Sequence, residues 1–397
     1  MPRFLSLTLA AALLAASQGA FADETPAMQA YGDGVNQLQL RNWSSAESSF
    51  RRAVKLKTDY AEAYDKLGQS LFNQRKVMEA VTDFKLAVAI DTRFTEAWYD
   101  LGFGLENMDT DLRLKDDDKT RKKLKKSEVD DAVAAYRKAL AVEPGNDIAA
   151  QANAHYRLGV LLRDGAMHAW RESHPEDETG TAAGEQPTLE KANLKEAMEN
   201  LEAANALNTD FPENRNELGR LYDIIGRYPE AIEQYDKAIA GDKNYAEAYS
   251  NRGVAWWKLG NWERALADTR KAVELDPNFA GGHYNFGEVT FAHVQELRHD
   301  GKDGDRSLVH MEAQKSVDEY RVATRLDPDL LPAWYGLARA YRGYFDFDNA
   351  EKVYNAILDK DKKQHRAKLL LKELIKERKA FESHIPKQYR DDQPKGN

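Results

Sequence analysis

Cysteine is absent from the 397 residues of this chain, as are several motifs on which common enzymes depend. Without cysteine the protein has no disulfide, no lipid-anchored cysteine and no cysteine nucleophile. The glycines form no phosphate-binding loop, and there is no GxSxG nucleophile motif. We therefore expect a protein without catalytic activity and without a cofactor, held together by packing alone.

Long apolar runs are also scarce. The clearest one spans residues 4–16, which is shorter than the roughly 20 residues needed to cross a bilayer. Arg3 precedes this run, and Ala20-Phe21-Ala22 follows it as a small-x-small cleavage site. We expect residues 1–22 to be a signal peptide cleaved after Ala22, and the protein to be exported, in a bacterium to the periplasm. An uncleaved membrane anchor is the alternative.

Basic residues are fewer than acidic ones, and the formal net charge is −9. This balance favours solubility and argues against nucleic acid as a partner.

What the sequence does contain is a repeated pattern, clearest over residues 246–279. When Ala246 is counted as position 1, Gly253 falls at position 8, Ala265 at position 20 and Ala272 at position 27. Small and aromatic residues at helical spacing lie on both sides of a turn at Gly260-Asn261, which predicts two helices whose backbones approach closely. Asp276-Pro277 then ends the second helix.

This segment resembles a tetratricopeptide (TPR) repeat, a helix–turn–helix unit of about 34 residues. The pattern recurs in register, with repeats that begin near residues 27, 61, 95, 152, 212, 246, 280 and 331. The resemblance implies an all-α fold, a right-handed superhelical solenoid of about eight repeats over residues 23–364. An amphipathic segment at 365–382 is expected to cap it, followed by a polar tail at 383–397.

Three repeats carry insertions between their two helices, near residues 109–127, 163–194 and 293–314. The first includes the basic run Arg121–Lys126. If the protein contacts a membrane, we expect the contact to be through this run. The alternative is that this run is a solvated extension of the second helix. The second insertion is expected to be a loop, with a short helix around Met167–Trp170.

The third insertion contains several potential metal ligands. Their spacing fits no established metal motif, so we expect a polar hairpin tip and no metal site. The ligands considered are His293, His299 and His310 with Asp300, Asp303 and Asp305.

The resemblance also implies a concave groove, lined by fixed positions of each first helix, that holds an extended peptide or a partner helix. Aromatic and charged side chains at these positions suit protein recognition, unless the rings only fill gaps between helices. The groove residues are Glu62, Asp65, Tyr99, Asp100, Phe103, Glu106, Asn251, Trp257, Tyr284, Asn285, Phe291, Tyr335, Arg339 and Arg342.

Two specialised ligand sites of the family are not reproduced. The clamp for chaperone carboxyl termini would need lysine where Asp65 and Tyr99 stand, and the asparagine ladder of the sugar-transferase branch is reduced to Asn251 and Asn285. We therefore expect an exported scaffold or adaptor for other proteins in envelope assembly, secretion or enzyme maturation. The alternatives are a glycan-binding solenoid of the cell wall and an accessory subunit that positions an exported enzyme.

Overall fold

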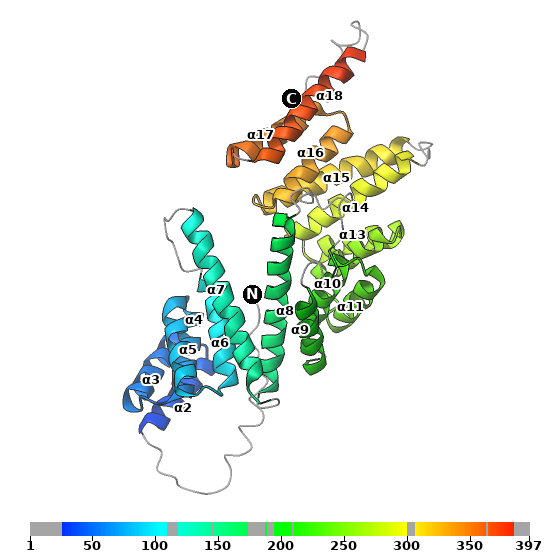
Figure 1. The fold of residues 1–397 in the computed structure, drawn as a ribbon. Helices are drawn as coiled ribbons and strands as arrows, with labels where there is room; N and C mark the ends of the chain where they lie inside the picture. The colour runs from blue at the N-terminus through cyan, green and yellow to red at the C-terminus, as the bar shows by residue number, and fades with distance from the viewer. Residues whose placement is uncertain are drawn as a thin grey trace. The chain divides into compact units, whose positions relative to one another are not determined.

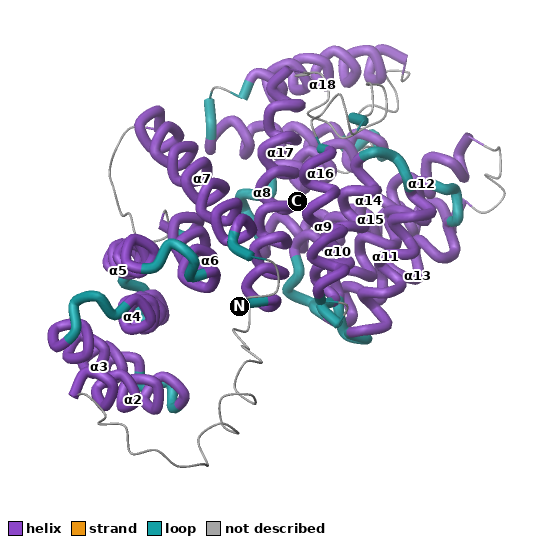
Figure 2. Tube along the Cα trace, turned by 60° about the horizontal axis from the view of Figure 1, so that its bottom comes forward, coloured by secondary structure: helices purple, strands orange, loops and turns teal. Residues whose placement is uncertain are grey.

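The computed structural model describes residues 26–108, 118–143, 147–173, 187–188, 194–208, 210–299, 306–362 and 364–384. Within these residues it contains seventeen helices and no strand (Figure 2). The expectation of an all-α helical-repeat fold is confirmed. The expected signal peptide and its cleavage site lie outside the described residues, as does the tail from residue 385.

The helices divide into two compact units, α2–α9 and α10–α18 (Figure 1). In the first unit each helix packs mainly on its neighbours in sequence, and the pairs are α2 with α3, α4 with α5, α6 with α7, and α8 with α9. The helices of this unit are α2 Pro26–Gln39, α3 Trp43–Leu56, α4 Ala61–Asn73, α5 Val77–Ile90, α6 Thr95–Glu106, α7 Asp118–Ala141, α8 Ile148–Ser173 and α9 Lys195–Leu207.

The second unit continues the same plan with four pairs, from α10 with α11 to α16 with α17, and a single last helix. Its helices are α10 Pro212–Ile224, α11 Tyr228–Gly241, α12 Ala246–Lys258, α13 Trp262–Leu275, α14 Ala280–His299, α15 Arg306–Leu326, α16 Leu331–Gly343, α17 Phe347–Lys360 and α18 His365–His384.

In five of the helix pairs, close packing depends on a glycine in the first helix and a ring in the second. A Cβ built on Gly68 would lie 2.5 Å from the ring of Phe84, and one on Gly102 would lie 2.7 Å from that of Tyr136. In the second unit Gly219 faces Tyr235 in the same way. The missing side chain lets the aromatic ring lie directly on the helix backbone, so position 8 is small for a packing reason.

The turn inside a regular pair always places one residue in the left-handed region, at position 15 of the repeat. Gly226 and Gly260 occupy it with φ of 77° and 75°, where glycine is unstrained. Arg41, Arg75 and Phe345 occupy it with φ of 59°, 64° and 62°. The fold therefore imposes this conformation even where the sequence supplies a side chain.

The turn between one pair and the next starts with an aspartate in several repeats. The Asp91 carboxylate accepts a hydrogen bond from the N–H of Arg93, and Asp242 and Asp276 each bond the N–H two residues on in the same way. Such a local bond competes with continuation of the helix and so ends it.

The insertions are partly helical extensions of the pairs. Helix α7 starts at Asp118, so the backbone of residues 121–126 continues the second helix of its repeat. Helix α8 runs unbroken to Ser173, so residues 167–170 belong to that long helix and not to a separate short one. Residues 109–117, 174–186, 189–193 and 300–305 lie outside the described part.

Helix α18 packs on α17 as the next first helix would in a longer array. Its Ala367 and Leu374 are buried, at 0% and 1% exposure, in the core of the last pair. Arg378 pairs with Asp348 and Glu351 of α17. None of the helices among the described residues is long and apolar enough to cross a membrane.

Candidate functional site

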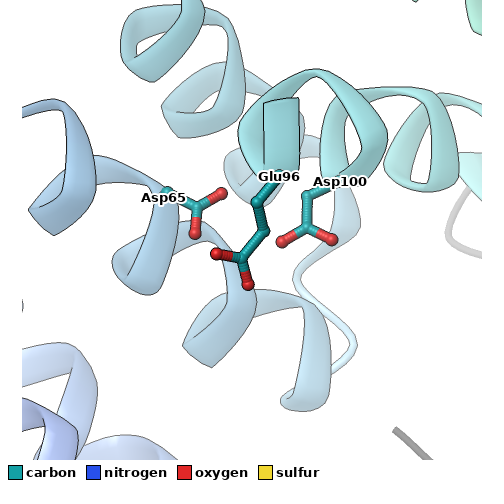
Figure 3. Close-up of side chains that lie close together, drawn as sticks. All are labelled: Asp65, Glu96 and Asp100. Carbon is teal, nitrogen blue, oxygen red and sulfur yellow. The ribbon is translucent and has the colours of Figure 1, made fainter. Parts of the chain in front are cut away.

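Helices α4 and α6 bring three carboxylates together on the face formed by the first helices of the repeats. Asp65 lies on α4, and Glu96 and Asp100 lie one turn apart on α6 (Figure 3). One oxygen from each lies within 4.8 Å of the others. Asp65 and Asp100 are buried, whereas the Glu96 side chain is 35% exposed. We refer to these residues as the acidic cluster.

Two neighbours on α4 bind the acidic cluster, one through an ion pair and one through hydrogen bonds. The ammonium of Lys66 lies 2.9 Å from Glu96 and 3.2 Å from Asp65. The Gln69 amide nitrogen donates to Asp100 over 2.6 Å and to Asp65 over 3.0 Å. The cluster therefore ties one repeat to the next through a network of charged hydrogen bonds.

Burial also changes the proton affinity of the cluster. Desolvation raises the pKa of Asp65 to about 6, against the opposing field of Lys66. Desolvation, together with Asp65 and Glu96, raises the pKa of Asp100 well above its ordinary value. Although burial alone would lower the pKa of Lys66, the carboxylates around it raise the value, so this lysine stays charged.

The acidic cluster is the one group of potential metal ligands that lies close enough together among the described residues. Because the Lys66 ammonium already supplies the positive charge there, the donor set does not favour a metal ion. Of the histidines in the third insertion, His293 packs against the ring of Trp262 at 5.3 Å. The side chains of the other ligands considered there lie outside the described part of the chain.

Half-buried aromatic rings lie beside the acidic cluster. Phe103 of α6 packs on Phe72 of α4 with centroids 5.2 Å apart, and Tyr99 stacks on Phe103 at 6.2 Å. Arg157 of α8 lies over the Phe103 ring, 5.5 Å from its centroid. These rings fill the space between adjacent first helices and also reach the surface.

Glu106 is held by its neighbours on both sides. It accepts a hydrogen bond from the Tyr136 hydroxyl at 3.0 Å and forms an ion pair with Arg157. Burial raises the pKa of Tyr136 well above its ordinary value, so its hydroxyl remains a donor. A carboxylate proposed for a ligand is thus already bound within the protein, while Glu62 at the start of α4 is exposed.

The second unit repeats this arrangement. The Tyr320 hydroxyl donates to Glu288 over 2.7 Å, and Arg339 of α16 donates to Glu288 over 2.5 Å and to Tyr320 over 3.2 Å. The Arg339 guanidinium lies over the Phe291 ring at 4.7 Å, and Tyr284 contacts Tyr320 at 6.3 Å. Of the predicted site residues, Arg339 therefore contacts Phe291 directly, and Tyr320 links it to Tyr284.

A third hydroxyl–carboxylate pair lies on the first pair of the second unit. Tyr235 donates to Asp223 over 2.6 Å. Burial raises the pKa of Asp223 to about 7, against the lowering effect of that hydrogen bond and of Lys258. Lys258 itself lies 4.1 Å over the ring of Trp257.

Polar side chains link the first helices of the second unit edge to edge. Asn251 of α12 donates to the Asn216 amide oxygen of α10 at 3.0 Å. Asn285 of α14 donates to the Ser250 hydroxyl of α12 at 2.9 Å. Asn251 and Asn285 therefore lie together on one face, as their repeat positions imply.

Helix α18 contacts two of the predicted residues of α16, Tyr335 and Arg342. Arg366 of α18 lies over the Tyr335 ring at 4.5 Å, and Arg342 forms an ion pair with Glu377 of α18. The exposed face of α16, the first helix of the last pair, is thus covered by α18.

Several residues of these networks were not predicted. They occupy the repeat positions from which the predicted residues were chosen, so applying the repeat numbering to every residue type would have found them. The residues concerned are Lys66, Gln69, Glu96, Arg157 and Glu288.

Family models match three segments of the chain. A tetratricopeptide repeat model matches residues 31–93, another matches residues 246–279, and a TPR repeat model matches residues 224–260. A comparison with curated proteins finds no match.

Solved structures with a similar arrangement share low sequence identity with this chain. The APC/C hetero-tetramer Cut9-Hcn1 is 17% identical with a TM-score of 0.49, over 79% of this chain and 48% of that one. A tetratricopeptide repeat protein from Parabacteroides merdae is 14% identical with a TM-score of 0.49, over 79% and 98%. YrrB, described as a TPR protein with an unusual peptide-binding site, is 21% identical with a TM-score of 0.39, over 59% and 95%. The chain thus spans about half the length of the first of these structures.

The family matches fall in both units, on α2–α5 and on α11–α13. The remaining pairs pack in the same way around a small residue in the first helix. The chain is a helical-repeat protein in which segments of both units match tetratricopeptide repeat models, and such repeats are indicative of a protein-interaction scaffold.

Proposed function

We propose that this protein is a noncatalytic scaffold that binds another protein on the face formed by its first helices. The observation that carries this proposal is the pair Phe72 and Phe103, two half-buried rings beside the acidic cluster. Rings supply apolar area that a partner can bury, and charges next to them fix its register. The ligand is an extended peptide or a helix, and its segment facing α4 carries a basic side chain for the exposed Glu62.

A glycan-binding role receives less support. Sugar rings stack on the open faces of aromatic side chains, but four of the predicted rings carry a cation of the protein over one face. These pairs are Phe103 with Arg157, Trp257 with Lys258, Phe291 with Arg339, and Tyr335 with Arg366. A partner protein needs only the ring edges and the neighbouring polar groups, so it is compatible with these contacts.

We further propose that the protein is exported, with a place in envelope assembly, secretion or enzyme maturation. This rests on the sequence features of residues 1–22, the positive Arg3, the short apolar run and the Ala20-Phe21-Ala22 site. Intact-mass measurement of the protein from an envelope fraction tests the idea. A chain that begins at Asp23 supports export, and a chain that retains residues 1–22 contradicts it.

The binding face is tested with paired ring deletions. The partner is first captured from envelope extract with the wild-type protein and identified by mass spectrometry. Replacement of Tyr99 and Phe103 by alanine, or of Trp257 and Tyr284, should then weaken binding to the purified partner. A loss of about 2 kcal/mol or more, roughly thirtyfold in affinity, is expected for a ring at a buried contact.

The matched control removes two half-buried rings from the turns that precede α4 and α6. The Tyr60→Ala, Phe94→Ala variant should bind as tightly as the wild type, and circular dichroism should show all variants to be helical. If the three insertions dock an enzyme instead, shortening residues 109–127, 163–194 and 293–314 disables binding while the ring deletions leave it unchanged. That outcome would favour the accessory-subunit hypothesis.

A further inference from the structure

The outer face of α18 is basic without interruption. Lys368, Lys372, Lys376 and Lys379 are all exposed. At 100° per residue they fall within a sector of roughly 80° and extend over about 16 Å of the helix. We refer to these four residues as the lysine face.

The four lysines form no ion pairs among the described residues. The glutamates of α18 that do form ion pairs serve arginines instead, Glu377 with Arg342 and Glu382 with Arg378. The lysine face therefore carries about four unneutralised positive charges in a chain whose formal net charge is −9.

The opposite side of the helix fixes this face outward. Ala367 and Leu374 are buried against the last pair, and Arg378 reaches Asp348 and Glu351 of α17. The helix therefore cannot turn its lysines toward carboxylates of the second unit without losing that packing.

Exposed apolar side chains border the lysine face on both sides. Leu369 is 49% exposed and Ile375 is 37% exposed, and each lies about 20° beyond the outermost lysine of its side. A basic helix face bordered by apolar side chains is typical of a segment that lies on a membrane surface.

We propose that the lysine face of α18 docks the protein on an anionic lipid bilayer. Protein interfaces favour arginine and are depleted of lysine, because the strongly hydrated ammonium lacks a fixed geometry for bidentate bonds. The same property suits a headgroup layer, which presents negative charge without a register. Leu369 and Ile375 enter the boundary between headgroups and acyl chains, and the net negative charge of the rest of the chain orients α18 toward the bilayer.

The test is cosedimentation of the full chain with lipid vesicles. The protein should bind vesicles of equal parts phosphatidylglycerol and phosphatidylcholine, bind phosphatidylcholine alone weakly, and be released as salt is raised. Each lysine near an anionic leaflet contributes about fivefold to partitioning. The variant with Lys368, Lys372, Lys376 and Lys379 all changed to Gln should therefore partition two to three orders of magnitude less.

The matched control changes net charge by the same amount elsewhere. Gln replaces four exposed lysines on other helices and turns, Lys55, Lys85, Lys243 and Lys271, and binding should fall little. Replacing the lysine face with arginines should preserve binding, because charge is kept. Equal binding by the lysine-face variant and the control variant would overturn the proposal. It would also be overturned if the wild type did not bind the anionic vesicles but bound polyglutamate. That result would indicate that the lysine face binds an acidic polypeptide.

A further variant in the same cosedimentation experiment tests the basic run of the first insertion. A variant with Gln at Lys122, Lys123, Lys125 and Lys126 should retain vesicle binding. If this variant loses binding while the lysine-face variant retains it, the membrane contact belongs to residues 121–126 and the inference about α18 is wrong.

Discussion

Gly34 of α2 lies so close to Phe50 of α3 that a Cβ added to the glycine would be 2.6 Å from the ring. Phe50 is fully buried, and its ring rests on the helix backbone at the point where α2 and α3 approach. The same relationship joins Gly68 to Phe84, Gly219 to Tyr235 and Gly287 to Tyr320.

The first prediction compares two glycines of the same helix. Gly34→Ala should destabilise the first pair by about 1 to 3 kcal/mol, because the buried Phe50 ring must move. Gly32→Ala should stabilise it by up to about 1 kcal/mol, because nothing lies within 4 Å of its added Cβ and alanine is the better helix former. Urea unfolding, followed by the NMR signals of residues in α2 and α3, measures the change in the free energy of unfolding for both variants. Equal effects would mean that the ring contact does not limit the pairing.

The second prediction concerns position 15 of the repeat, where Arg75 and Phe345 have positive φ. Arg75→Gly should stabilise its turn by about 1 kcal/mol or less, since glycine relieves the left-handed strain. Phe345→Gly should have the opposite sign, because the Phe345 ring stacks on Phe381 of α18 at 5.0 Å. Thermal melting gives the change in stability of each variant, and hydrogen exchange of α18 shows whether the contact with Phe381 has been lost. A stabilising Phe345→Gly would show that the stack contributes little.

The third prediction is a pH dependence centred on His283 of α14. Its Nδ1 lies 2.6 Å from the Glu319 carboxylate and its Nε2 lies 3.1 Å from the Pro277 carbonyl, so both nitrogens must donate. Burial and Arg325 lower the pKa of His283, but these hydrogen bonds and the Glu319 charge raise it above its ordinary value. The stabilisation is therefore complete below the ordinary histidine pKa of about 6.5 and is lost as pH rises through the raised value.

An NMR titration of the imidazole measures this pKa directly. In Glu319→Gln the pKa should fall, because the carboxylate charge is removed while a hydrogen-bond acceptor remains. The pH dependence of exchange at the start of α14 should weaken with it. A His283 pKa at or below the ordinary value in the wild type would contradict the expected direction.

The fourth prediction concerns the role of α18 at the end of the array. Deleting residues 365–382 removes Leu374 from the core and breaks the Arg342–Glu377 pair. Amide protection should then fall first in α16 and α17, while α12 and α13 stay protected, because each pair contacts mainly its neighbours. A uniform loss of protection across α10–α17 would indicate one cooperative unit.

The sequence by itself determined the helical pairs. A glycine at position 8, a ring or small residue in the second helix and an aspartate at its end act within one repeat, over distances that the local chain spans. Gly219 with Tyr235, and Asp242 at the end of α11, show why this information is readable without coordinates. The helix periodicity is fixed by backbone geometry, so the all-α fold followed from it.

Tertiary structure alone decided what the predicted site residues contact. Glu106 and Arg157 are 51 residues apart, as are Glu288 and Arg339, and they meet only because successive first helices stack. The positions of the cations over Phe103 and Phe291 follow from the same stacking. Repeat numbering placed these side chains on one face, but their pairing depends on rotamers and on neighbours brought in from other repeats. Local periodicity cannot encode such contacts, because each is chosen by competition among charges that only the folded array brings together.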